Sequence, residues 1–147
     1  MERGEVGGRG SNSWHSWKAN HPHWLAEKKI FILVQVALER APDLKDVPLM
    51  HELAKNDEDR EVLKFMSSDM GISRAVVTTP GVPADRLAAF RTAFDTMMKD
   101  PEFLADASKA KMDISPSTGQ QAQAVAESML KAPPKVIERA RALIGAK

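Results

Sequence analysis

Polar residues that could bind an anion follow a glycine-rich run, residues 7–10, near the start of the chain. When a strand ends in such a run and a helix begins after it, free backbone N–H groups and the positive end of the helix dipole favour a carboxylate. Serine and asparagine add hydrogen-bond partners, arginine offers its planar fork, and tryptophan can cover the apolar part of a ligand. The sequence therefore predicts a ligand-binding segment that consists of Arg9, Ser11, Asn12, Ser13 and Trp14.

The same residues also fit a plainer interpretation. Serine and asparagine are preferred helix N-caps, and caps are far more common than ligand sites. Tryptophan is highly buried on average, so Trp14 could pack in a core while Arg9 lies in solvent. From the residue pattern alone, capping is the favoured interpretation, and ligand binding stays open beside it.

Three of the four histidines lie near this segment and raise the alternative of a metal-binding module. They are His15, His21 and His23, and the last two flank a proline that fixes the turn between them. No acidic residue stands beside this turn to orient a metal-bound imidazole. The default interpretation is therefore a set of solvated loop histidines, and we predict no metal site.

The sequence contains none of the familiar catalytic patterns. It has no cysteine, which excludes thiolate nucleophiles and thiolate metal sites, and no Gly-x-Ser-x-Gly or Gly-Lys-Ser/Thr motif. Lys and Arg number 21 and Asp and Glu 20, so the net charge of +1 lacks the basic excess of a nucleic-acid binder. We expect a protein that is not an enzyme, needs no cofactor and binds no nucleic acid.

Strand-like and helix-like segments alternate along the 147 residues, a length typical of one domain. The longest apolar run, within Ile30–Ala37, has the composition of a strand buried on both faces of a sheet. Shorter strands are expected over Val6–Gly10, Ile72–Thr78 and Met112–Ser115. Their alternation with helices predicts the α/β fold class.

Helix signals are clearest in the second half of the chain. Apolar residues at positions 87, 90, 94 and 97 predict an amphipathic helix over residues 83–99. Asp100 followed by Pro101 starts the next helix, and Ser117 with Gln120 forms a capping box for another. Further helices are expected over residues 14–19, 49–54 and 57–68 and from residue 133 onward.

Several segments together resemble one family of transport receptors. They are the turn and helix at Pro42–Ala54, the proline-glycine loop Thr79–Leu87 and the run Met98–Phe103, in the right order and at suitable spacing. The opening Glu2–Gly8 resembles the family's helix end and following strand. The family is that of the solute receptors of tripartite tricarboxylate transporters, also called Bug-type periplasmic binding proteins. The resemblance covers nearly the whole chain.

This resemblance implies a fold, a function and partners. Members are two-lobed α/β proteins that bind a small organic carboxylate in the cleft between lobes and present it to the membrane permease subunits. The chain would then have a partial type II periplasmic-binding-protein-like fold. Residues 1–71 would belong to the second, C-terminal lobe, and residues 72–147 would return to complete the first lobe with three to four helices. The segment at residues 7–14 would match a second-lobe loop that faces the cleft.

The chain is shorter than such a receptor, which sets further expectations. A signal peptide, most of the first lobe and the start of the second would precede this chain, so we expect a truncated fragment. The resemblance implies a periplasmic location, although this chain shows no signal peptide. A truncated lobe leaves an unmatched sheet edge and apolar helix faces. The alternative function is therefore a structural or interaction fragment that self-associates through these surfaces.

Overall fold

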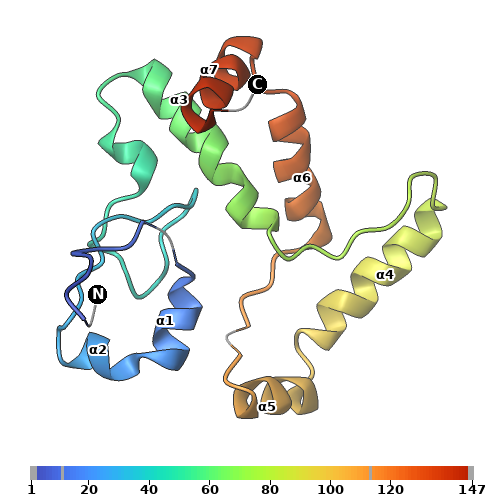
Figure 1. Cartoon of the computed structure of the whole chain (residues 1–147). Coiled ribbons are helices and arrows are strands. Elements are labelled where there is room, and N and C mark those ends of the chain that lie inside the picture. Colours follow the sequence, from blue (N-terminus) through green and yellow to red (C-terminus); the bar gives the residue numbers. More distant parts are fainter. Residues whose placement is uncertain (1–2, 11, 113, 146–147) are drawn as a thin grey trace. The chain divides into compact units, whose positions relative to one another are not determined.

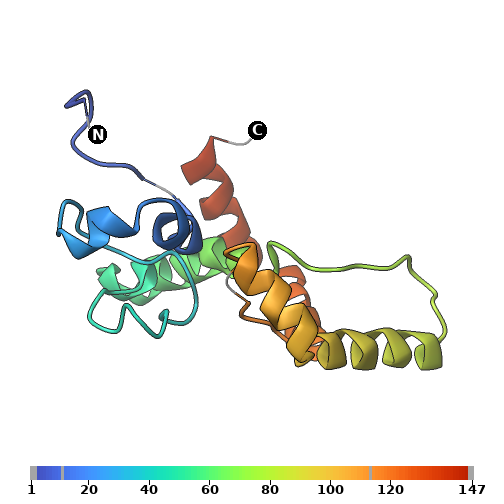
Figure 2. The same ribbon diagram turned by 90° about the horizontal axis from the view of Figure 1, so that it is seen from below.

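A computed structural model describes residues 3–10, 12–112 and 114–145 of the chain. Within these residues the backbone forms short helices joined by turns and coil, and Figures 1 and 2 draw no strand arrow there. The strand-type pairing in the described part is one isolated parallel bridge between Gln35 and Leu49. None of the helices in these ranges is both long and apolar enough to cross a membrane.

The predicted α/β class, and with it the partial type II periplasmic-binding-protein-like fold, is therefore wrong. The segment Ile30–Ala37 is extended coil outside its one bridge, and Phe31 is 76% exposed and Leu33 79% exposed. A strand needs a neighbouring strand to pair its backbone N–H and C=O groups. β-Branched and aromatic composition favours a strand without supplying that neighbour.

The other predicted strands are coil, bend or 3₁₀ helix in the described residues. Val6–Gly10 is coil and bends, and Ile72 ends the 3₁₀ helix η2 (Ser68–Ile72). The rest of Ile72–Thr78 is a turn followed by coil. In Met112–Ser115, residue 113 lies outside the described residues and the other three are coil.

The chain divides into two compact units, each built from two separate stretches. Unit 1 contains Met1–Phe31 and Thr96–Ser115, and unit 2 contains Ile32–Asp95 and Pro116–Lys147. The predicted boundary at residue 71 concerns the lobes of a full-length receptor and stays a prediction.

Unit 1 is built from α1 (Trp14–Asn20), α2 (Pro22–Ala26) and α5 (Pro101–Lys109) (Figure 1). The predicted start of α5 is confirmed, because the Asp100 side chain accepts a hydrogen bond of 2.8 Å from the Phe103 N–H. Pro101 occupies the first helical position, where its missing N–H costs nothing. The short helix α2, which begins at Pro22, was not expected from the sequence.

Unit 2 has its core around α3 (Asp57–Ser67), whose Val62 and Ser67 are fully buried. Asn56 caps α3, since its side-chain oxygen accepts a hydrogen bond of 2.8 Å from the Asp59 N–H. The turn at residues 44–47 precedes α3 in the sequence. The side-chain amide of the buried Gln35 holds this turn by donating hydrogen bonds of 2.9 and 2.8 Å to the carbonyls of Leu44 and Val47. The helices of unit 2 are η1 (Met50–Leu53), α3 (Asp57–Ser67), η2, α4 (Ala84–Met97, whose last two residues belong to unit 1), α6 (Gly119–Leu130) and α7 (Pro134–Ile144).

Two details of these helices differ from the sequence-based expectation. The capping box of α6 is formed by Thr118 and Gln121, one residue later than predicted, because the Ser-Thr and Gln-Gln pairs allow either register. The apolar stripe of α4 is not buried, and Phe90 is 66% exposed. Helical spacing thus predicted the helix correctly but not a core beneath it.

Candidate functional site

The predicted ligand-binding segment lies in unit 1, at the start of α1. Arg9 and Asn12 are exposed, and Ser11 lies outside the described residues. Ser13 is the N-cap of α1, and its hydroxyl accepts a hydrogen bond of 3.4 Å from the Ser16 N–H. Trp14 is the first residue of α1 and is half-buried. The capping role of Ser13 is thus observed, and a ligand-binding role for the five residues stays a prediction.

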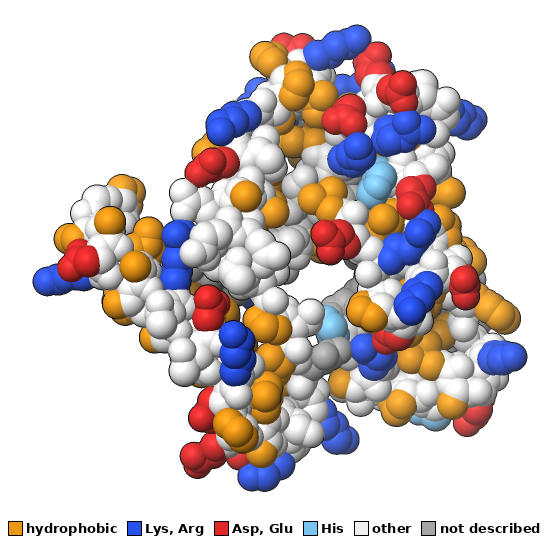
Figure 3. Space-filling view, turned by 180° about the vertical axis from the view of Figure 1, so that it is seen from behind, with side chains coloured by type: hydrophobic (Ala, Val, Ile, Leu, Met, Phe, Trp, Pro, Cys, Tyr) orange, Lys and Arg blue, Asp and Glu red, His pale blue; other side chains and the backbone are white. Residues whose placement is uncertain are grey.

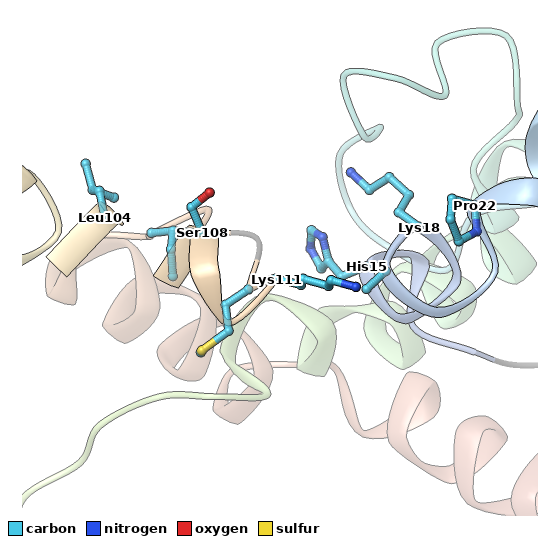
Figure 4. A pocket seen from close by; sticks show the side chains of 9 residues that line it. His15, Lys18, Pro22, Leu104, Ser108 and Lys111 are labelled. Carbon is cyan, nitrogen blue, oxygen red and sulfur yellow. The ribbon is translucent and has the colours of Figure 1, made fainter. Parts of the chain in front are cut away.

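A hollow of about 610 Å³ lies in the same unit, next to this segment (Figure 4). Two lysines and a histidine supply its basic groups, and one serine adds a hydroxyl. The remaining side chains are hydrocarbon or thioether. The lining consists of His15, Lys18, Ala19, Pro22, Leu104, Ser108, Lys111, Met112 and Ile114.

The lining residues that come from α1 lie on one face of that helix, as helical periodicity requires. His15, Lys18 and Ala19 are three and four residues apart, so they share one face of α1. On the other side, Leu104 and Ser108 are one turn apart on α5. Figure 4 shows His15 and Lys18 on the α1 side of the hollow and Leu104 and Ser108 on the α5 side.

Lys111 reaches the hollow from the turn that ends α5. Its φ is 55°, in the left-handed region, and its N–H donates a hydrogen bond of 2.9 Å to the Ser108 carbonyl. The Met112 N–H donates one of 2.8 Å to the Ala107 carbonyl. These two bonds form a Schellman motif, in which glycine usually occupies the position of Lys111.

Lys18 lines the hollow and also contacts Trp14 of the predicted ligand-binding segment. The Lys18 Nζ lies 5.7 Å from the centre of the Trp14 ring, within reach of a cation–π interaction. Trp14 therefore stands at the edge of the basic group of side chains rather than apart from it. Two lysines and a histidine give the lining a basic character that favours an anion.

Two of the histidines that raised the metal-binding alternative, His21 and His23, contact tryptophan rings. The ring of His21 stacks on Trp24 with centres 4.4 Å apart and planes 17° apart, and Trp17 lies 5.4 Å from Trp24. The described ranges contain no group of three or more His, Asp or Glu side chains that could hold a metal ion. The rings pack as an aromatic cluster, an arrangement that lends the metal-binding alternative no support.

The carboxyl groups of Glu27 and Glu52 have shifted pKa values, and neither residue lines the hollow. A hydrogen bond from Lys29, 2.7 Å away, and its charge hold the pKa of Glu27 below the usual range. In unit 2, the Leu49 backbone N–H, helped by Arg40, lowers the pKa of Glu52. Both interactions belong to local turns. Neither carboxylate adds a charge to the lining of the hollow.

Sequence reasoning missed most of the hollow. Lys18, Ser108 and Lys111 carry no motif that would mark them as members of a site. The two sides of the lining are about ninety residues apart in sequence, and only the fold of unit 1 brings them together.

Comparison of the chain with models of protein families, with curated proteins and with solved structures finds no match.

Proposed function

We propose that this chain is the solute-binding part of a receptor that binds a small organic carboxylate and presents it to the permease subunits of a tripartite tricarboxylate-type transporter. The link to the transporter rests on the ordered motifs at Pro42–Ala54, Thr79–Leu87 and Met98–Phe103. This proposal concerns the ligand and the partner, and it does not depend on a two-lobed α/β architecture.

The observation that carries the proposal is the convergence of His15, Lys18 and Lys111 on one hollow of unit 1. A carboxylate there gains charge-assisted hydrogen bonds from the lysine ammonium groups, which are stronger than bonds between neutral groups. The Ser108 hydroxyl can donate a further bond. A neutral amide of the same shape lacks the charge that these groups recognise.

Calorimetric titration of the chain tests the proposal. The ligands are acetate, succinate, citrate, benzoate and hexanoate, each compared with its neutral amide at constant ionic strength. We expect at least one acid to bind and its neutral amide to bind more weakly. Lys18→Gln should weaken binding about tenfold or more, the loss expected for a hydrogen bond to a charged group.

The matched control is Lys109→Gln. Lys109 follows Ser108 on α5, but it does not line the hollow, and its Nζ pairs with Asp106 at 2.8 Å. This variant should bind as the parent chain does. The proposal fails if no acid binds, or if Lys18→Gln and Lys109→Gln weaken binding equally.

A second candidate function is that of an interaction fragment. It is favoured by the apolar side chains that the fold leaves in solvent, among them Val76 at 85% exposure. An isolated exposed apolar residue is ordinary, but extended apolar segments invite association. A second copy of the chain is the partner that this candidate predicts.

A further inference from the structure

We infer that the hollow of unit 1 selects a monocarboxylate with an apolar body, such as a short alkyl chain or a single aromatic ring. This inference rests on the proposed function, because it names the class of carboxylate that the same site takes. The expected ligand has one anionic end and a hydrocarbon end, and is distinct from a polycarboxylate of the citrate kind.

The chemistry of the lining is divided between charge and hydrocarbon. Five of the nine lining residues, those at positions 19, 22, 104, 112 and 114, offer only hydrocarbon or thioether surface. The four polar residues are His15, Lys18, Ser108 and Lys111. A ligand with charge at one end can meet both kinds of surface at once.

The α5 side of the hollow carries most of its large apolar side chains. Leu104 and Met112 lie in solvent to a substantial extent and both line the hollow. An alkyl chain or ring placed against them removes apolar surface from water, which is favourable in proportion to the area covered. Sulfur in Met112 adds the adaptable, polarisable contact that suits ligands of varied shape.

A polycarboxylate fits this surface less well. A second or third carboxylate placed directly against the Leu104 or Met112 side chain would lose water to a surface that offers no hydrogen-bond donor. Citrate would therefore have to turn its additional charges toward the basic side chains or into solvent, away from this apolar surface. The apolar part of the hollow would then contribute nothing to its binding.

The test is a calorimetric titration of the chain with butyrate, hexanoate, octanoate, benzoate and citrate at one ionic strength. We expect the affinity to rise about twofold to fourfold for each added methylene, as transfer of hydrocarbon from water predicts. Hexanoate and benzoate should bind at least tenfold more tightly than citrate. Hexanol, which has the body without the charge, should bind more weakly than hexanoate.

Met112→Gln is the variant that isolates the apolar contact. Because Met112 is 56% exposed, the substitution leaves packing intact, and circular dichroism checks this. It should weaken hexanoate binding several-fold and leave acetate binding unchanged. The control is Met97→Gln, since Met97 is an exposed methionine of unit 1 outside the hollow and should change neither.

The possible results separate this inference from the proposed function. If citrate binds more tightly than hexanoate and Lys18→Gln weakens it, the apolar class is wrong and the carboxylate receptor stands. If affinity does not depend on chain length, the apolar class is again wrong. If no carboxylate binds, both proposals fail. If hexanol binds as well as hexanoate, the hollow is an apolar site without anion recognition, which also contradicts both.

Discussion

Two lysines of this chain occupy a backbone position that usually belongs to glycine. Lys28 has a φ of 54° and Lys111 a φ of 55°, and each follows the end of a short helix. Lys28 donates its N–H to the Leu25 carbonyl at 3.1 Å, as Lys111 does to the Ser108 carbonyl at 2.9 Å. The left-handed conformation costs a residue with a Cβ about 1–2 kcal/mol, so lysine there is locally unfavourable.

The two lysines differ in one respect, because Lys111 lines the hollow and Lys28 does not. Strained backbone positions often occur at functional sites, where the unfavourable conformation aims a side chain. For Lys111 the turn places an ammonium group at the hollow. Lys28 provides a natural comparison in the same kind of helix end.

At the residue scale, we predict that Lys111→Gly and Lys28→Gly each stabilise the chain by about 1 kcal/mol, because glycine relieves the left-handed strain. Urea denaturation measures this gain. Only Lys111→Gly should weaken carboxylate binding in a calorimetric titration. A Lys111→Gly variant that is more stable but binds the carboxylate more weakly would show that Lys111 has a functional role that Lys28 lacks. Equal affinities for both variants would contradict the role assigned to Lys111.

At the scale of elements, α3 is the helix around which unit 2 packs. It contacts its sequence neighbours η1 and η2 and also α7, which lies far away in the sequence. The α7 contact is reinforced by Lys135 to Glu58 at 3.1 Å and Arg139 to Asp59 at 2.6 Å. These pairs are exposed, so each adds only a fraction of a kcal/mol, and the buried Val62 contributes more.

The N-cap of α3 contributes to the stability of unit 2, because α3 is the helix around which this unit packs. We predict that Asn56→Ala lowers the free energy of unfolding by about 1 kcal/mol, because the Asp59 N–H loses its side-chain acceptor. Hydrogen exchange of the first turn of α3 should speed up correspondingly. Asn20→Ala is the control, since Asn20 is exposed at the last position of α1. An equal loss in both variants would exclude a specific capping effect.

The sequence predicted helices far better than strands, for a physical reason. A helix pairs its own backbone and carries its end signals locally, as Asp100-Pro101 does for α5 and Asn56 could do for α3. A strand depends on a distant partner, and Ile30–Ala37 has none beyond the bridge at Gln35 in the described residues. The short helix α2 was missed because His21-Pro22 indicates a turn as readily as a helix start.

The candidate site was predictable only in part, for the same reason. Ser13 could be recognised as a cap because capping depends on neighbours in sequence. Lys18 and Lys111 could not be recognised, since their meeting depends on how α1 and α5 come together within unit 1. Local chemistry is visible in a sequence, whereas convergence of distant residues requires the fold.

At the scale of the whole molecule, much apolar surface lies in solvent. Figure 3 shows hydrophobic side chains between charged ones over the face it presents. The coil that follows η2 carries Val76 at 85% and Val77 at 84% exposure. Extended apolar backbone with unpaired polar groups is a template for association.

We predict that the chain self-associates, with a sedimentation-average mass that rises with concentration. Val76→Lys should shift this association to higher concentration, because a charge on exposed coil opposes edge pairing. Thr79→Lys adds the same charge to the same coil without removing an apolar side chain, and should have a smaller effect. A monomer of constant mass at all concentrations would contradict the prediction, and would also remove the interaction-fragment candidate.

The most direct test of anion binding is an NMR titration of the ¹⁵N-labelled chain with hexanoate. The proposed site predicts saturable amide shifts that cluster at His15, Lys18, Ser108 and Lys111 and are much smaller when the same concentration of hexanamide is added. Shifts confined to unit 2, or equal shifts with hexanamide, would contradict carboxylate binding in the hollow of unit 1. A titration without any shift would do the same.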